Sequence, residues 1–514
     1  MNVNGFMFSL PASYSGISKL QDQLSTLQNQ LATGDKAATL ADMGSVRFTD
    51  LTVRSRLSRL TAYDTNINTV NLRLDTMNQV LTSLSTVNSN ARSAVTVGQY
   101  GSNNINLATA PSTAGQQLDQ VLSSLNTDLN GHYLFGGGTT QVAPVATMDV
   151  AMNGSGTLAG FKTVAAQRLQ ADQGADGLGR LAFTTPPTAP DTVTLSEDGA
   201  QPFGYKLASV SSGSTAFTLT QPGSTAPASL AIKVATQPAA GDTVTVGLKL
   251  PDGTTDSIAL KAVTGTPQNP GEFQIGTTTA DTATNLQAAL RSQLQADGQT
   301  KLAAASNYAA ATGFFNGQGQ SVQRVAIDTA TNSYYNATGY ESAAQAASDT
   351  VQWYQGEDSN GAARQSVSTK VDDDTTVSYG VEANEFGITQ LVRSLAVQSI
   401  QSYPTTDDAT TAVSKARFDA VANGQINNLS ALNDSTSGSI ASIGVDLGLA
   451  QSTLKDLSDR HTAYSAQLQG ILSDAETADP NEVASALLDL QTRLSASYSA
   501  VAMISQLQLA NYLK

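Results

Sequence analysis

The sequence predicts an α+β protein: a long antiparallel helical bundle or coiled-coil rod built from both chain ends, with one or more inserted β-rich outer domains. Three observations predict this class. Apolar seams at helical spacing lie near both termini, two long heptad-like stretches lie inside them, and the middle of the chain turns rich in Thr, Ser, Ala, Gly and Pro. Apolar residues three and four apart mark a helix face, whereas short alternating runs between turn residues mark strands.

The first expected helix covers residues 14–32 and stops at Thr33-Gly34, where glycine suits a helix C-cap. Its seam has the apolar spacing of a helix that needs a partner. The seam residues are Ile17, Leu20, Leu24, Leu27 and Leu31. Because a lone helix of this length buries little, we expect the seam to be covered by another helix.

A second, much longer helix is expected to begin near Thr49 or Asp50 and to continue to about residue 95. This length is far above that of an ordinary globular helix and favours coiled-coil-like packing. Its expected core positions are Leu57, Leu60, Ile67, Leu74 and Leu81. The pattern breaks over residues 98–112, and a third helix is expected over residues 114–129.

The middle of the chain, residues 141–345, is expected to form one β-rich domain or two, divided at about residues 237 and 238. The clearest hairpin lies between residues 242 and 260, where Val244 and Val246 begin an alternating run and Pro251-Asp252-Gly253 supplies a turn. Segments 351–356 and 376–381 resemble two strands of a β-hairpin at the base of this insertion.

Helices are expected again over residues 387–403 and 412–432, and the clearest heptad follows them. Its core positions are Leu447, Leu454, Leu457, Tyr464 and Leu468. The last helix begins at Asp479-Pro480, since aspartate caps helices and proline suits their first turn. Its seam residues are Val483, Leu487, Leu490, Leu494, Val501, Ile504 and Leu507.

These elements predict a nested domain organisation. Residues 1–34 and 479–514 would pair as terminal coiled-coil helices, and residues 35–140 and 346–478 would form a helical rod domain with a β-hairpin. Residues 141–345 would be the solvent-facing insertion. We therefore expect the assembly interface to consist of the two terminal seams, which are mobile in a free subunit and order between neighbouring subunits.

Composition excludes several functions. The net charge is −15 although only 13% of the residues are charged, which argues against nucleic acid and against an anionic membrane surface as partners. The sequence has no cysteine, so disulfides and thiolate sites are excluded. The first residues lack the basic and apolar regions of a secretory signal, and no apolar run is long enough to span a bilayer. Export would thus not use a cleaved signal peptide.

No catalytic, metal-binding or cofactor-binding cluster is expected. His132 and His461, the two histidines of the chain, lie too far apart for the paired ligands of a zinc-protease helix, and His461 occupies a heptad core position. Residues 372–374, three aspartates, lack the spacing of a calcium loop and suit a solvated turn. Glu382 and Glu385 have no obvious acid–base partner, so a structural role is expected.

Two further motifs suit structural roles. The glycines at 136–138 are not followed by the Lys-Ser/Thr of a phosphate-binding loop. They are predicted to form a hinge into the inserted domain. Trp353 with Tyr354 is expected to be a core or interdomain anchor.

Several segments resemble the bacterial flagellin superfamily. Residues 24–34 (LSTLQNQLATG) are similar to its amino-terminal helix and glycine stop, the helix from Asp50 onward resembles its long rod helix, and residues 490–514 resemble its carboxy-terminal helix. Two further segments resemble the hook-associated junction proteins of this superfamily. Their signature residues are Gly131, Tyr133, Leu134, Phe135, Gly136, Gly137, Tyr354, Gln355 and Gly356.

The resemblance implies an extracellular structural subunit of the flagellum, exported unfolded through the flagellar type III apparatus, with no enzymatic activity and no cofactor. It implies as partners copies of the chain itself, a neighbouring hook-associated protein, flagellin and an export chaperone. Two alternatives to the hook–filament junction remain: a flagellin that forms the filament itself, and a surface adhesin or enzyme carried on the insertion.

Overall fold

The computed structural model describes residues 10–184 and 188–512, and the side chains of residues 14–184 and 188–506 among them. The chain groups into two compact units. The terminal unit comprises Met1–Asn71, Thr369–Val377 and Ser452–Lys514, and the insert unit comprises Leu72–Ser368 and Ser378–Gln451.

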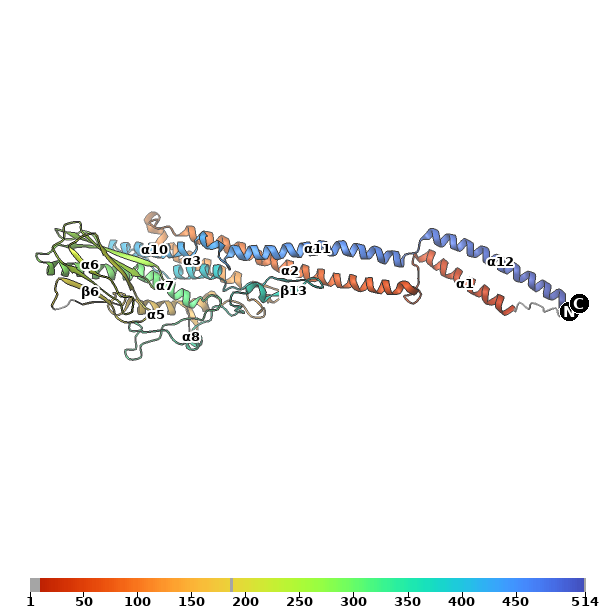
Figure 1. The fold of residues 1–514 in the computed structure, drawn as a ribbon, viewed down its shortest axis with the longest axis horizontal. Helices are drawn as coiled ribbons and strands as arrows, with labels where there is room; N and C mark the ends of the chain where they lie inside the picture. Colours follow the sequence, from red (N-terminus) through yellow and green to blue (C-terminus); the bar gives the residue numbers. More distant parts are fainter. Residues whose placement is uncertain (1–9, 185–187, 513–514) are drawn as a thin grey trace. The chain divides into compact units, whose positions relative to one another are not determined.

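The terminal unit is built from helices that come from opposite ends of the chain. Helix α1 (Leu10–Thr33) packs along α12 (Pro480–Tyr512), as Figure 1 shows. The first part of α2 (Arg47–Ala94) packs on the last part of α11 (Ile440–Glu476), with Val53, Leu60 and Leu468 buried between them. The predicted pairing of long helices from both chain ends is therefore confirmed.

The insert unit contains two four-stranded sheets. The first has the strand order β5-β6-β9-β8, with bounds Leu181–Thr184, Thr192–Glu197, Ser229–Val234 and Phe217–Thr220. The second has the order β12-β11-β10-β7, with bounds Glu272–Gln274, Thr255–Val263, Thr243–Lys249 and Lys206–Ser212. Strands β10 and β11 are antiparallel, with Val246 opposite Ile258, so the hairpin expected there is present. Together with the helices, these sheets confirm the α+β class.

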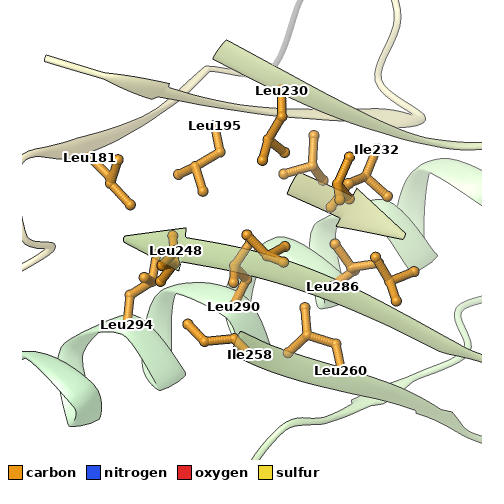
Figure 2. Close-up of a cluster of buried hydrophobic side chains, with 14 of the residues drawn as sticks. Leu181, Leu195, Leu230, Ile232, Leu248, Ile258, Leu260, Leu286, Leu290 and Leu294 are labelled. Atoms are coloured by element: carbon orange, nitrogen blue, oxygen red, sulfur yellow. The ribbon is translucent and has the colours of Figure 1, made fainter. Parts of the chain in front are cut away.

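One apolar core serves both sheets of the insert unit (Figure 2). Leu195 and Leu230 from the first sheet and Leu248 and Ile258 from the second point into it, and α6 (Thr279–Gln299) adds Leu290. Helix α6 starts with a capping box, in which the Thr278 hydroxyl accepts a hydrogen bond from the Asp281 backbone N–H and the Asp281 carboxylate accepts one from the Thr278 backbone N–H. Alternating burial along β6, β9 and β10 thus places one face of each sheet on this core.

Several helices of the insert unit pack around one alanine-rich helix, α7 (Lys301–Phe314). Small side chains on most of its faces let neighbouring helices approach closely: α5 (Phe161–Gln173), α9 (Phe386–Ser399) and α10 (Asp408–Asn428) all contact it. The shorter elements are α4 (Met148–Asn153), α8 (Ala343–Asp349), β1 (Asp128–Leu129), β2 (His132–Tyr133), β3 (Gly154–Ser155) and β4 (Leu158–Ala159).

Helix α3 (Ile105–Leu125) differs from the expected span of residues 114–129. It starts earlier and contains Pro111, because Leu107 and Ala110 are buried in a cluster with Phe418 and this packing outweighs the local break signal. It ends at Leu125, earlier than expected, and Asn126 is its C-cap residue. The Asn126 side chain makes two hydrogen bonds with the backbone of Val145, at 2.9 and 3.1 Å, which hold the chain in its path away from the helix.

The expected pairing of segments 351–356 and 376–381 is wrong. Strand β14 (Thr376–Ser378) instead pairs with β13 (Ser368–Lys370), and the turn between them holds the aspartates at 372–374. The 351–356 segment runs beside residues 144–146, because Trp353 is buried and its indole N–H donates to the Asn316 carbonyl at 3.1 Å. The structural anchor expected at Trp353 is therefore present.

The segment before α3 is held to α10 by Tyr100. Its hydroxyl donates a 2.6 Å hydrogen bond to Asp419, and its ring meets Phe418 edge-on at 6.0 Å. Burial and then the hydrogen bond to Asp419 raise the pKa of Tyr100 to about 12. A raised folded-state pKa stabilises the fold fully below the pKa of an unfolded tyrosine, about 10, and this contribution is lost as the pH rises through about 12.

Replacing Tyr100 with Phe is therefore expected to flatten the fall in unfolding free energy between about pH 10 and pH 12, because the phenol that titrates there is gone. Denaturant titrations of both proteins at the two ends of this pH window give the unfolding free energies, and hence the change in unfolding free energy with pH. Equal slopes for the variant and the wild-type chain would contradict the role given to Tyr100.

No helix in the part of the chain that the structure describes combines the length and apolar character needed to cross a membrane.

Candidate assembly interface of the terminal helices

Helices α1 and α12 cover each other's seams only in part. Ile17, Val483 and Leu490 are buried, whereas Leu31 is 48% exposed. The other described seam residues are half-buried: Leu20, Leu24, Leu27, Leu487, Leu494, Val501 and Ile504. The side chain of Leu507 lies outside the described residues. Two helices side by side bury one stripe each, so apolar surface remains open along the pair.

The open surface of this helix pair includes large side chains outside the predicted seams. Tyr14 on α1 is exposed, and so are Leu488 and Met503 on α12. The Gln21 side-chain amide donates a 2.7 Å hydrogen bond to the Tyr498 hydroxyl, which ties the outer faces of the two helices together. Sequence reasoning missed these residues because they fall outside the heptad stripe.

The two helices are joined to the rest of the terminal unit by a short backbone pairing. The Lys36 N–H donates to the Glu476 carbonyl at 2.6 Å, and the Ala478 N–H donates to the Gly34 carbonyl at 2.8 Å. At the start of α12, Asp479 accepts a 2.8 Å hydrogen bond from the Asn481 N–H, as expected of an N-cap. Both helix ends are thus fixed locally, although their shared seam is incompletely covered.

An ionic cluster borders this connection. Asp50 is fully buried and lies 3.1 Å from the Arg54 guanidinium, which also contacts Glu476. Side-chain hydrogen bonding with Glu476, and then with Arg54, lowers the pKa of the Asp50 carboxyl. The Arg54 guanidinium thus lies between two carboxylates, those of Asp50 and Glu476, where α2 meets α11.

Nearly all of the predicted rod-core residues are buried. Ile67, Leu74, Leu81, Leu447, Leu454 and Leu457 are buried, as are Leu60 and Leu468. Leu57 is half-buried, and Tyr464 is 39% exposed, with its hydroxyl 2.9 Å from Arg56 Nη1. His461 is buried at its heptad position, and its Nδ1 lies 2.8 Å from the Asp64 carboxylate.

The two signature segments meet inside the insert unit. Gly136 bridges to Glu382, and its carbonyl accepts a 3.0 Å hydrogen bond from the Glu357 N–H. A Cβ on Gly356 would lie 2.8 Å from the Gly136 Cα, so this contact requires glycine at 356. Leu134, Phe135, Gly136 and Gly137 are buried, Tyr133, Tyr354 and Gly356 are half-buried, and Gly131 and Gln355 are exposed.

The two glutamates near this junction are buried rather than in an open loop. Glu385 forms an ion pair with Arg364, and Glu382 accepts a 2.6 Å hydrogen bond from the Gln318 amide. Burial raises the pKa of Glu385, and Arg364 counters this. Sequence reasoning could not find Arg364, because its contact with Glu385 follows from a loop whose conformation has no periodic signal. Among the described residues, no group of three His, Asp or Glu side chains is placed to hold a metal ion.

Gly34 gives a local test of how α1 ends. Its φ is +80°, and a Cβ there would meet no atom within 4 Å, so only backbone strain opposes a side chain. Gly34→Ala is expected to lower stability by about 1–2 kcal/mol, the cost of a left-handed residue. Gly16→Ala is the matched control: this site inside α1 is equally open and should gain about 0.5–1 kcal/mol.

Hydrogen exchange of the α1 amides measures both changes. Slower exchange in Gly34→Ala than in the wild-type chain would show that the end of α1 is not set by the backbone conformation at residue 34. Faster exchange in Gly16→Ala would show that alanine does not strengthen the interior of α1.

Comparison with known protein families matches residues 4–140 to the bacterial flagellin N-terminal helical region. This match covers the amino-terminal seam, the whole of α2 and the first signature segment. No curated protein matches the chain.

Proposed function

With residues 4–140 matching the flagellin N-terminal helical region, we propose that this chain is a structural subunit of the bacterial flagellum that assembles through its terminal helices. The observation that carries the proposal is the incomplete burial of the α1–α12 seam, which leaves Leu20, Leu24 and Leu494 half-covered in one subunit. Covering each such side chain contributes up to about 1.5–3 kcal/mol. Neighbouring subunits would complete the seam.

The proposed organisation follows from this seam. Residues 1–34 and 479–514 form the innermost layer of a helical tube outside the cell, and residues 35–140 and 346–478 form the next layer. Residues 141–345 face solvent. The chain has no enzymatic role in this proposal, and its partners are copies of itself and other flagellar proteins, with an export chaperone before secretion.

More specifically, we propose that the chain acts as hook-associated protein 3, which joins the hook to the filament. Support comes from the two signature segments, whose glycines at 136 and 356 permit one close backbone contact. The size of the insertion favours the alternative, a flagellin that forms the filament itself.

A seeding experiment distinguishes the two roles. Purified chain is mixed with sheared filaments or with isolated hooks, and growth is followed by sedimentation and electron microscopy. A junction protein should add to hooks and stop after about one or two turns, whereas a filament flagellin should grow long tubes. Failure to add to either seed would contradict the assembly proposal as a whole.

A further inference from the structure

A groove in the insert unit has a charge opposite to that of the protein as a whole. Its volume is about 530 Å³, which lies in the range of ~300–1,000 Å³ typical of small-molecule sites. None of its lining residues is Asp or Glu, whereas Lys162 and Arg417 both line it. On a chain with a net charge of −15, a concave surface with cations and no carboxylate needs an explanation.

Four packed helices form the groove. One face of α5 runs along it, with Lys162 near the start of the helix and Gln173 at its end, about 16 Å apart at 1.5 Å per residue. Helices α7 and α10, the last residue of α9 and the three residues that follow it complete the walls. Because α5, α9 and α10 each pack on α7, the walls belong to one rigid core.

Both cations are held by neutral groups. Lys162 Nζ donates to the Asn153 side-chain oxygen at 2.8 Å, and Arg417 Nε donates to the Gln299 carbonyl at 2.9 Å. Gln173 donates to the neighbouring Gly298 carbonyl at 3.1 Å, so Arg417 lies near the α5 C-terminus, away from Lys162. Among the described residues neither cation pairs with a carboxylate, so the charge of each is available to a ligand.

Asn307 supplies a second, independent observation. This α7 residue is only 8% exposed, lines the groove, and its amide has no hydrogen-bond partner within the described chain. Neither amide atom of Asn307 is among the fully buried polar atoms that lack a partner, so the amide reaches the surface of the groove, where a ligand can bond to it in place of water. Its amide can both donate and accept, which suits a hydroxyl group.

The remaining lining is mixed. Gln401, Ser399 and Ser402 add further amide and hydroxyl groups, whereas Ala165, Leu169 and Ala303 form an apolar floor. Hydroxyl-rich rings with one apolar face fit such a wall, and anionic substituents fit the cationic ends. We propose that this groove binds an acidic disaccharide, with Lys162 and Arg417 each contacting one of its two carboxylates and Asn307 a ring hydroxyl.

The test is isothermal titration calorimetry of the full chain with digalacturonate, with the uncharged disaccharide lactose and inorganic phosphate as comparison ligands. We expect saturable binding of digalacturonate that weakens as salt is added, at least tenfold weaker binding of lactose, and no comparable binding of phosphate. The proposal would be overturned if digalacturonate bound with a dissociation constant above about 10 mM. It would also be overturned if lactose or phosphate bound as tightly as digalacturonate.

Three variants locate the site. Lys162→Gln removes one cation and should weaken binding about fivefold, whereas Lys249→Gln, an equal charge change at an exposed position on β10, should leave it unchanged. Ala166→Trp, at an exposed position on the α5 face of the groove, should block binding while both cations remain. Circular dichroism melting curves show that each variant is folded. Unchanged affinity in Ala166→Trp would place any observed binding elsewhere and overturn the assignment.

Discussion

Leu24→Asp and Leu494→Asp are each expected to abolish assembly at concentrations where the wild-type chain assembles. Both side chains are half-buried in the α1–α12 pair, so each has apolar surface left for a neighbouring subunit. Because about half of each side chain is already covered within the subunit, losing the remaining burial costs about 0.8–1.5 kcal/mol, which by itself raises the critical concentration about four- to tenfold. Burying an unpaired carboxylate at the seam adds a further cost.

The critical concentration is measured by sedimentation after seeding. Thr218→Asp, on an exposed edge-strand position of β8, is the matched control, because it adds the same charge to the proposed solvent-facing domain. Assembly by Leu24→Asp or Leu494→Asp at the wild-type concentration would show that the terminal seams are not the interface. Loss of assembly in Thr218→Asp would show that added charge alone, at any site, prevents it.

Leu290→Ala is expected to lower the stability of the insert unit by about 2–5 kcal/mol. Leu290 is 0% exposed in the core shared by the two sheets and α6 (Figure 2), so truncation leaves a cavity that the sheets cannot close. Leu290→Met is the matched control: it keeps the side-chain volume nearly constant and should cost less than about 1.5 kcal/mol.

Denaturant unfolding followed by tryptophan fluorescence suits this measurement, because the single tryptophan of the chain, Trp353, is buried in the insert unit. Equal midpoints for Leu290→Ala and Leu290→Met would contradict a shared, tightly packed core. The proposed function adds a second expectation: below its unfolding midpoint, Leu290→Ala should still assemble on seeds, because the proposed interface lies in the terminal helices.

Much of the candidate site could be predicted because helical periodicity is a local property. The seams at Ile17 and Leu490, the glycine stop at Gly34 and the cap at Asp479 each depend on residues within a few turns of one another. Partners distant in sequence could not be predicted in this way. Nothing near His461 indicates Asp64, and nothing near Glu385 indicates Arg364, because side-chain contacts of this kind depend on how loops and helices pack.

The sequence by itself determined the fold class and its most periodic elements: long helices from both ends, alternating strands in the middle, and the turn between β10 and β11. Only the tertiary structure decided that β14 pairs with β13, that α3 runs through Pro111, and how much of each terminal seam one subunit covers. The physical reason is that repeating apolar patterns encode a local backbone period, whereas strand partners and burial depend on which distant surfaces pack together.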